Sequence, residues 1–194
     1  MRPAGEPRSP DPPVEAPPRA TERVSSRVLV HTGDGKGKSS AAMGVVLRAV
    51  SAGWSVAVVQ FVKSGHWRSG EEEAARRLGV DWWSLGDGFT WDSQDMDETE
   101  AVAREAWRSA AALIRAGEHR LVVLDEVTYP VNWGWIETSE VVEAIASRPP
   151  QVSVIATGRD APAELRDVAD TVTEMVSEKH AFDRGVGAMR GIEF

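Results

Sequence analysis

Residues 32–39 read Thr32-Gly33-Asp34-Gly35-Lys36-Gly37-Lys38-Ser39, and they form the most informative segment of the chain. It follows the apolar run Val28 to Thr32 and leads directly into an alanine-rich segment. The ending Gly-Lys-Ser is that of a Walker A loop, with Thr32 at the position where the consensus has glycine. In such a loop the backbone N–H groups turn towards phosphate oxygens, and the next helix adds the positive end of its dipole. The stretch therefore predicts a strand, a phosphate-binding loop and a helix.

The chemistry of the loop favours a nucleoside triphosphate with Mg²⁺. The Lys38 ammonium can neutralise phosphate charge, and the Ser39 hydroxyl can ligate the metal. Between residues 25 and 48 there are four basic side chains and one acidic one, in a chain with a net charge of −8. A dinucleotide loop fits less well, because its G-x-G-x-x-G pattern would need glycine in place of Lys38. A glycine-rich turn without a ligand is the remaining alternative.

Outward from the loop, short apolar runs alternate with longer amphipathic ones, as expected when strands are joined by helices. Several runs are almost continuously apolar, which is typical of buried parallel strands. We therefore expect a single α/β domain over residues 25–194, P-loop NTPase-like (RecA-like), with a mostly parallel sheet and helices on both faces. The expected strands are Val28–Thr32, Val56–Phe61, Val80–Ser84, Leu121–Asp125, Val152–Thr157 and Thr171–Met175, and the expected helices are Lys38–Ala52, Gly70–Leu78, Asp95–Gly117, Thr138–Ser147 and Pro162–Val168.

Composition excludes several classes of protein. The chain has no cysteine, which removes disulfides, thiolate nucleophiles and cysteine-ligated metals. Its negative net charge argues against a nucleic-acid or membrane-surface partner. No apolar run is long enough to cross a bilayer or to act as a signal peptide, so a cytoplasmic protein is expected. Seven of the eleven prolines fall within the first 18 residues, which predicts an extended, disordered tail over residues 1–24. This tail is interpreted as a solvated leader or as a flap that orders over a ligand.

A second half of the nucleotide site is expected at the end of another buried strand. Leu121 to Leu124 are apolar and are followed by Asp125 and Glu126, the pattern of a Walker B strand. Carboxylates at that position hold Mg²⁺ or its water shell opposite the phosphate loop. We therefore expect Ser39, Asp125 and Glu126 to be the metal site.

The segment from Trp82 to Trp91 is rich in aromatic residues and glycine, where a strand should meet the cleft. Its rings could line a pocket for a large flat ligand. Trp82 and Trp83 are more simply explained by packing in the core. Phe89 and Trp91 follow a glycine-containing turn, where core packing is less natural.

Taken together, these residues resemble the P-loop type of cob(I)alamin adenosyltransferase, or corrinoid adenosyltransferase. The resemblance runs from about Val28 to Phe194 and rests on six motifs in order. The motifs are Thr32 to Ala42, Val59-Gln60-Phe61-Val62-Lys63 with Trp67 and Gly70-Glu71, Gly88-Phe89-Thr90-Trp91, Leu124-Asp125-Glu126-Val127-Thr128-Tyr129, Thr157-Gly158-Arg159, and Lys179-His180-Ala181-Phe182 through Gly191-Ile192-Glu193-Phe194.

The resemblance implies an unusual use of ATP, in which a cobalt(I) corrinoid attacks the ribose C5′ carbon and inorganic triphosphate leaves. The nucleophile then belongs to the corrin, which agrees with the absence of cysteine and of an evident activated side chain. The protein's task is to position two reactants and to stabilise charge on the triphosphate. Lys38 is the expected catalytic residue of the loop. The expected ATP-binding residues are Gly33, Asp34, Gly35, Lys36, Gly37, Lys38, Ser39, Ser40 and Arg48, the last near the nucleoside.

Phe89 and Trp91 match the aromatic pair that the family places at the corrin. By resemblance, they displace the lower axial ligand of cobalt(II), which makes the metal easier to reduce, and they exclude water. A flavodoxin-like protein or reduced flavin would supply the electron, and a homodimer is implied. The chain departs from the family at Ser39, which replaces the usual threonine and keeps the hydroxyl, and its proline-rich leader does not match the helix that caps the site in some members.

Two other functions share the same loop. One is an ordinary P-loop ATPase or small-molecule kinase, in which Asp125 and Glu126 surround an attacking water or hydroxyl. The other is a binding module gated by nucleotide. The sequence leaves open whether the corrinoid is cobalamin or cobyrinic acid a,c-diamide, and so whether the role is biosynthesis or salvage.

Overall fold

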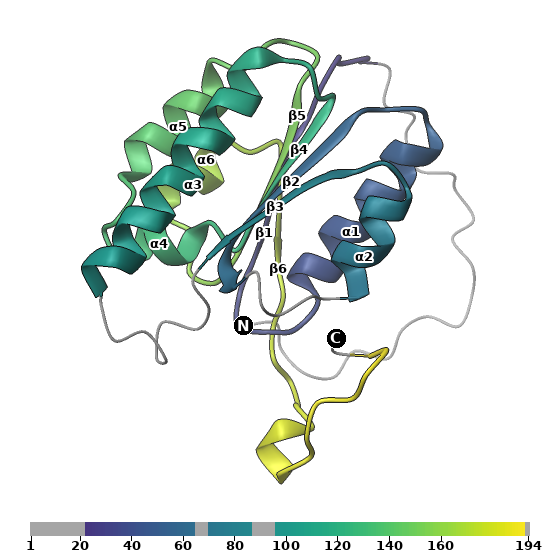
Figure 1. Ribbon diagram of the computed structural model, residues 1–194, viewed down its shortest axis with the longest axis vertical. Helices are drawn as coiled ribbons and strands as arrows, with labels where there is room; N and C mark the ends of the chain where they lie inside the picture. The colour runs from purple at the N-terminus through teal and green to yellow at the C-terminus, as the bar shows by residue number, and fades with distance from the viewer. Residues whose placement is uncertain (1–21, 65–69, 87–95, 193–194) are drawn as a thin grey trace, which may run out of the picture.

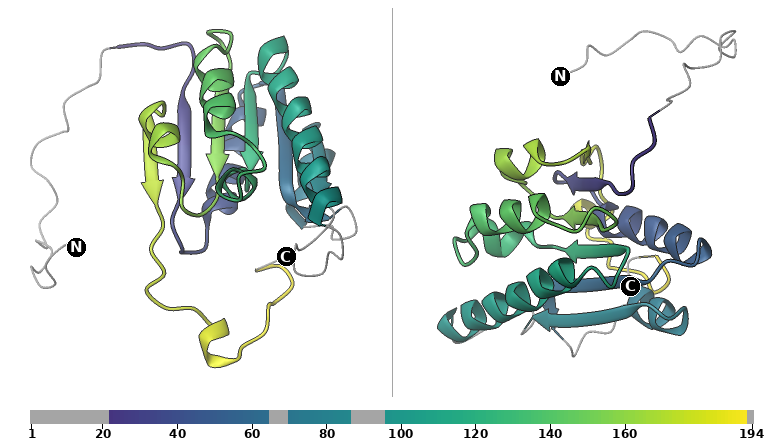
Figure 2. Two further views of the ribbon diagram at one scale, coloured as in Figure 1. Left: turned by 90° about the vertical axis from the view of Figure 1, so that its left-hand side faces the viewer. Right: turned by 90° about the horizontal axis from the view of Figure 1, so that it is seen from above.

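The computed structural model describes residues 22–64, 70–86 and 96–192. Its centre is a six-stranded sheet in the order β3-β2-β4-β5-β1-β6, and every paired strand is parallel to its neighbour. Helices cover both faces (Figures 1 and 2). The predicted P-loop NTPase-like α/β fold is confirmed.

The observed elements follow the predicted ones closely. A main departure is the short helix α4, which the sequence did not suggest because it spans five residues, contains Pro130 and carries no helical apolar repeat. Strand β2 also runs three residues beyond the predicted end at Phe61. The elements are β1 (Val28–Thr32), α1 (Lys38–Ser51), β2 (Val56–Ser64), α2 (Gly70–Arg77), β3 (Asp81–Gly86), α3 (Met96–Ala116), β4 (Leu121–Asp125), α4 (Thr128–Asn132), α5 (Thr138–Ala146), β5 (Ser153–Thr157), α6 (Ala163–Asp167), β6 (Thr171–Glu174) and the 3₁₀ turn η1 (Phe182–Arg184).

Two apolar layers hold the sheet between its helices. Successive strand residues point to opposite faces, so Leu121 and Val123 pack with α1 and α2, whereas Val122 and Leu124 pack with α3 and α5. Strands β4 and β5 are buried at every residue. This burial on both faces explains why their sequences are nearly continuous apolar runs.

Trp82 and Trp83, for which the sequence favours packing in the core, lie in packing positions. Trp82 is 4% exposed and belongs to the layer beneath α1 and α2, while Trp83 packs against the opposite layer. Neither lines the cavity described below. Packing, rather than ligand binding, therefore accounts for this pair.

Parallel strands bring their carboxyl ends to one edge of the sheet, at the bottom of Figure 1. The phosphate loop follows β1 at this edge, and Glu126 follows β4; β5 lies between the two strands. After β6, residues 175–192, called here the C-terminal segment, run below the same edge (Figures 1 and 2). Among the described helices, none combines the length and apolar character that crossing a bilayer requires.

Candidate active site

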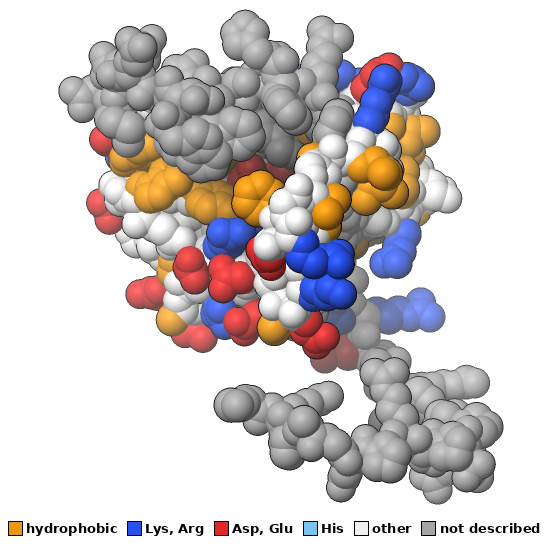
Figure 3. Space-filling model, turned by 90° about the horizontal axis from the view of Figure 1, so that it is seen from below, with side chains coloured by type: hydrophobic (Ala, Val, Ile, Leu, Met, Phe, Trp, Pro, Cys, Tyr) orange, Lys and Arg blue, Asp and Glu red, His pale blue; other side chains and the backbone are white. Residues whose placement is uncertain are grey.

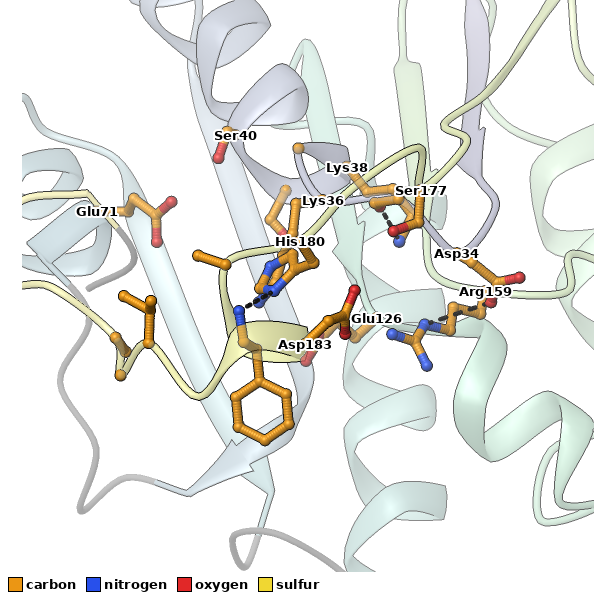
Figure 4. A pocket seen from close by; sticks show the side chains of 18 of the residues that line it. Asp34, Lys36, Lys38, Ser40, Glu71, Glu126, Arg159, Ser177, His180 and Asp183 are labelled. Atoms are coloured by element: carbon orange, nitrogen blue, oxygen red, sulfur yellow. Dashed lines mark hydrogen bonds and ion pairs between the residues drawn. The ribbon is translucent and has the colours of Figure 1, made fainter.

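A cavity of about 670 Å³ opens at the carboxyl edge of the sheet, between the phosphate loop and the C-terminal segment (Figure 4). Seen from this edge, basic and acidic side chains gather around the middle of the face (Figure 3). Ligands of parallel α/β proteins bind at this edge, outside the carboxyl ends of the strands. The lining residues include Asp34, Gly35, Lys36, Gly37, Lys38, Ser39, Ser40, Glu71, Glu126, Tyr129, Arg159, Ser177, His180 and Asp183.

The phosphate loop ends where α1 begins. Gly37 stands before the helix with φ of +109°, a left-handed conformation that favours glycine, and Lys38 is the first helical residue. The Lys38 ammonium donates hydrogen bonds to the carbonyl oxygens of Gly33 (2.6 Å) and Gly35 (2.7 Å). Burial and, next, the positive charge of Arg159 lower the pKa of Lys38 below its ordinary value, and the nearby acids only partly offset this.

Gly33 and Gly35 also meet the chain that leaves β6. A Cβ on Gly33 would lie 2.4 Å from the carbonyl oxygen of Met175, and one on Gly35 would lie 2.8 Å from the backbone of Val176. Two backbone hydrogen bonds seal this contact, from Met175 N to Thr32 O (2.8 Å) and from Gly35 N to Met175 O (2.7 Å). The loop glycines therefore serve the packing of the C-terminal segment as well as the approach of phosphate.

The two acids after β4 have different surroundings. Glu126 lines the cavity and has φ of +64°, and its N–H donates to Thr157 Oγ1 at 2.9 Å. Asp125 is 1% exposed and accepts hydrogen bonds from Gln60 Nε2 and Thr157 Oγ1, both at 2.8 Å. Asp125 is not among the residues that line the cavity. Its placement suits a group that holds Thr157, and through it Glu126, in position.

The cavity offers oxygen donors suited to Mg²⁺. Ser39 and Glu126 both line it, and a hydroxyl and a carboxylate are ligands that this ion prefers. Within the described ranges no three His, Asp or Glu side chains gather as they would in an all-protein metal site. Mg²⁺ usually binds one or two protein oxygens together with substrate phosphates and water.

Several lining residues were not among the predicted site residues. Arg159 follows β5, and its Nε lies 3.8 Å from Asp34 Oδ1. Tyr129 belongs to α4 and has its pKa raised, first by burial and next by Glu126. Each of the two residues lies shortly after the end of a predicted strand, and that position was the signal available in the sequence. The C-terminal segment supplies much of the remaining wall.

The predicted loop residues from Asp34 to Ser40 all line the cavity, and Gly33 adjoins it through the Lys38 bond. Arg48 does not line it: the residue is exposed in the last turn of α1, about 15 Å along the helix axis from Lys38. A role for Arg48 at the nucleoside stays a prediction. Phe89 and Trp91 lie outside the described residues.

Comparison with known proteins agrees with this site. Residues 25–194 match the family model described as ATP:corrinoid adenosyltransferase BtuR/CobO/CobP. The corrinoid adenosyltransferase of Escherichia coli (strain K12) is 41% identical over 186 residues, covering 91% of this chain and 94% of the relative. That of Pseudomonas aeruginosa is 45% identical over 169 residues, covering 86% and 83%. The corrinoid adenosyltransferase CobA of Salmonella typhimurium is 40% identical over 167 residues, covering 86% and 85%. With its fold, its phosphate loop and matches of this extent, the chain belongs to the ATP:corrinoid adenosyltransferase family.

Proposed function

We propose that this protein transfers the 5′-deoxyadenosyl group of ATP to the cobalt(I) of a corrinoid and releases triphosphate. The cobalt(I) electron pair forms the cobalt–carbon bond at C5′, and the C5′–O bond breaks with its electron pair leaving on the triphosphate. The observation that carries the proposal is the family match over residues 25–194 together with the phosphate loop and Glu126 around one cavity. The corrinoid is the second substrate, either cobalamin or cobyrinic acid a,c-diamide.

The chain's own contribution is to bind and to stabilise charge. Lys38 and Arg159 place two positive side chains on the cavity, beside the backbone N–H groups at the start of α1. Such preorganised charges stabilise negative charge as it accumulates on a leaving group. For Lys38 to act, its ammonium must exchange the carbonyl oxygens of Gly33 and Gly35 for phosphate oxygens.

Mg²⁺ belongs to the same proposal, with Ser39 and Glu126 as the residues that would hold it. When bound, the ion neutralises phosphate charge and orients the triphosphate. Asp125 acts indirectly: Thr157 both donates to its carboxylate and accepts from the Glu126 backbone. This arrangement holds Glu126 at the cavity, which Asp125 itself does not line.

The remaining parts of the proposal rest on resemblance to the family. Phe89 and Trp91 displace the lower ligand of cobalt(II), and a flavodoxin-like protein or reduced flavin supplies the electron. The protein functions as a homodimer in the cytoplasm.

The test is to incubate the protein with ATP, Mg²⁺ and chemically reduced cobalamin. The expected result is the light-sensitive spectrum of adenosylcobalamin with triphosphate as co-product. An ordinary ATPase or kinase, the rival function, would instead give ADP with no change in the corrinoid spectrum, and that result would overturn the proposal. Repeating the assay with a,c-diamide corrinoids compares the candidate substrates.

A further inference from the structure

His180 lies on the wall of the cavity that faces the phosphate loop. It belongs to the C-terminal segment, is partly buried and lines the cavity together with Ser177 and Asp183. Figure 4 shows its ring in the middle of the site, in the same view as Lys36 and Glu126. His180 therefore belongs to neither the Walker A nor the Walker B segment.

The tautomer of the ring follows from its hydrogen bond. The backbone N–H of Phe182 donates to Nδ1 of His180 at 3.1 Å. An Nδ1 atom that accepts a hydrogen bond carries a lone pair, so the proton of the neutral ring resides on Nε2. The Phe182 contact therefore fixes the ring as an Nε2–H donor and restricts its orientation.

The backbone that carries His180 is fastened to the phosphate loop. Met175, five residues earlier, exchanges backbone hydrogen bonds with Thr32 and Gly35 on either side of Gly33. The backbones of Gly33 and Met175 lie so close that a Cβ on Gly33 would meet the carbonyl oxygen of Met175 at 2.4 Å. The start of the segment that carries His180 is thereby anchored at the loop that lines the cavity.

The cavity needs donors besides its cations. Lys36, Lys38 and Arg159 line it, but so do four carboxylates, Asp34, Glu71, Glu126 and Asp183. A bound triphosphate carries several negative charges, so donors that are not matched by acids strengthen its binding. The Nε2–H of His180 supplies such a donor.

We propose that His180 is a triphosphate-binding residue, whose Nε2–H donates a hydrogen bond to a phosphate oxygen of bound ATP and of the released triphosphate. The ligand class is a linear inorganic or nucleoside polyphosphate. The inference deepens the proposed function and rests on it for the identity of the product. Binding of triphosphate can nevertheless be measured without any corrinoid.

The test uses the full chain with Mg²⁺ and inorganic triphosphate in titration calorimetry. His180→Ala should weaken binding roughly 10-fold, as expected for loss of a hydrogen bond to a charged acceptor. His180→Gln should stay within about threefold of the unsubstituted protein, because its amide places an N–H at the position of Nε2. Glu178→Gln, an exposed neighbour outside the cavity, is the matched control. Unchanged binding by His180→Ala, or equal loss in His180→Gln, would overturn the proposal.

A second measurement follows triphosphate binding in the unsubstituted protein and does not require any variant to bind triphosphate. In the nitrogen-15 spectrum of the unsubstituted protein, the His180 signals are identified by their loss in His180→Gln. Added triphosphate should shift the Nε2 signal while Nδ1 keeps the chemical shift of an acceptor. Absence of any shift at Nε2 would refute the contact even if neither variant bound triphosphate. Production of ADP in the adenosylation assay would overturn the proposed function alone and leave the triphosphate result standing.

Discussion

The Nζ atom of Lys38 lies 2.6 Å from the carbonyl oxygen of Gly33, so the lysine is bonded to its own phosphate loop. The Lys38 ammonium donates a second hydrogen bond to another carbonyl oxygen of the loop, that of Gly35. A triphosphate that enters the loop must replace both carbonyl oxygens with phosphate oxygens. Hydrogen bonds between charged partners are stronger than those to neutral carbonyls, so this exchange favours the bound nucleotide.

Lys38→Ala should abolish adenosylation even when the corrinoid is supplied as cobalt(I), because the cavity loses an ammonium that stabilises charge on the leaving triphosphate. We expect a loss of kcat of at least about 100-fold, comparable to removal of one preorganised donor. Lys179→Ala, an exposed lysine of the C-terminal segment outside the cavity lining, is the control and should retain activity. Near-normal turnover by Lys38→Ala would contradict the assigned role.

The lowered pKa of Lys38 predicts how activity falls at alkaline pH. Burial and Arg159 disfavour the ammonium in the free enzyme, whereas bound phosphates favour it. As the pH rises, the free enzyme therefore loses its Lys38 proton first. Since kcat/KM reports the free enzyme and kcat the complex, kcat/KM for ATP should decline at lower pH than kcat.

The Arg159→Ala variant checks this assignment. It removes a positive charge that lowers the pKa of Lys38, so the decline in kcat/KM should move to higher pH even though overall activity falls. Burial and, next, the charge of Glu126 raise the pKa of Tyr129, so its phenol ionises at higher pH than an ordinary tyrosine. Coincident declines of kcat and kcat/KM in the unsubstituted protein would argue against titration of Lys38.

Gly33→Ala should destabilise the protein by more than backbone strain alone. A left-handed residue costs a non-glycine side chain about 1–2 kcal/mol, and here the added Cβ would also meet Met175 O at 2.4 Å. Gly53→Ala is a matched control, with φ of +73° and no atom within 4 Å of the added Cβ. Urea unfolding should show a distinctly larger loss of unfolding free energy for Gly33→Ala. Equal losses would mean that the contact with Met175 contributes nothing.

The sequence predicted those parts of the site that follow from local chemistry. The Gly-Lys-Ser ending placed Lys38 at the start of a helix, and the apolar run before Asp125 placed the acids at the end of a buried strand; both placements are confirmed. The run alone did not separate Asp125 from Glu126. Their different surroundings arise from Gln60 and Thr157, which reach Asp125 from neighbouring strands.

Local sequence patterns do not predict contacts between segments that lie far apart in the chain. The sequence explains the glycine at position 33 by phosphate binding alone, because no residue near it in the chain indicates the contact with Met175. The C-terminal segment has little regular structure and several exposed large apolar side chains, including Phe182 at 73% exposure. The segment has no helical or strand-like pattern of apolar residues, so its sequence does not predict that it lines the cavity. Its position follows from the pairing of β6 with β1.

Trp91→Ala should separate reduction of the corrinoid from adenosyl transfer. By resemblance to the family, Trp91 helps to remove the lower ligand of cobalt(II), so the variant should lose most activity when the assay starts from cobalt(II) with a reduced flavin. Turnover from chemically prepared cobalt(I) should be nearly unchanged, because that step has been bypassed. Comparable losses in the two assays would refute this role.

Asp125→Asn and Glu126→Gln should have opposite signatures. The asparagine amide would place a donor against one of two donors, Gln60 Nε2 and Thr157 Oγ1, which leaves a buried polar group unsatisfied and costs about 1–3 kcal/mol of stability. Glu126→Gln removes a carboxylate at the cavity, so it should raise the Mg²⁺ concentration needed for half-maximal activity while changing stability by no more than about 0.5 kcal/mol. Asp167→Asn, an exposed carboxylate outside the cavity lining, controls for the charge change. Thermal unfolding and Mg²⁺ titrations of activity distinguish the two acids. If Asp125→Asn left stability intact and raised the Mg²⁺ requirement as Glu126→Gln does, Asp125 would be a metal ligand rather than a positioning residue.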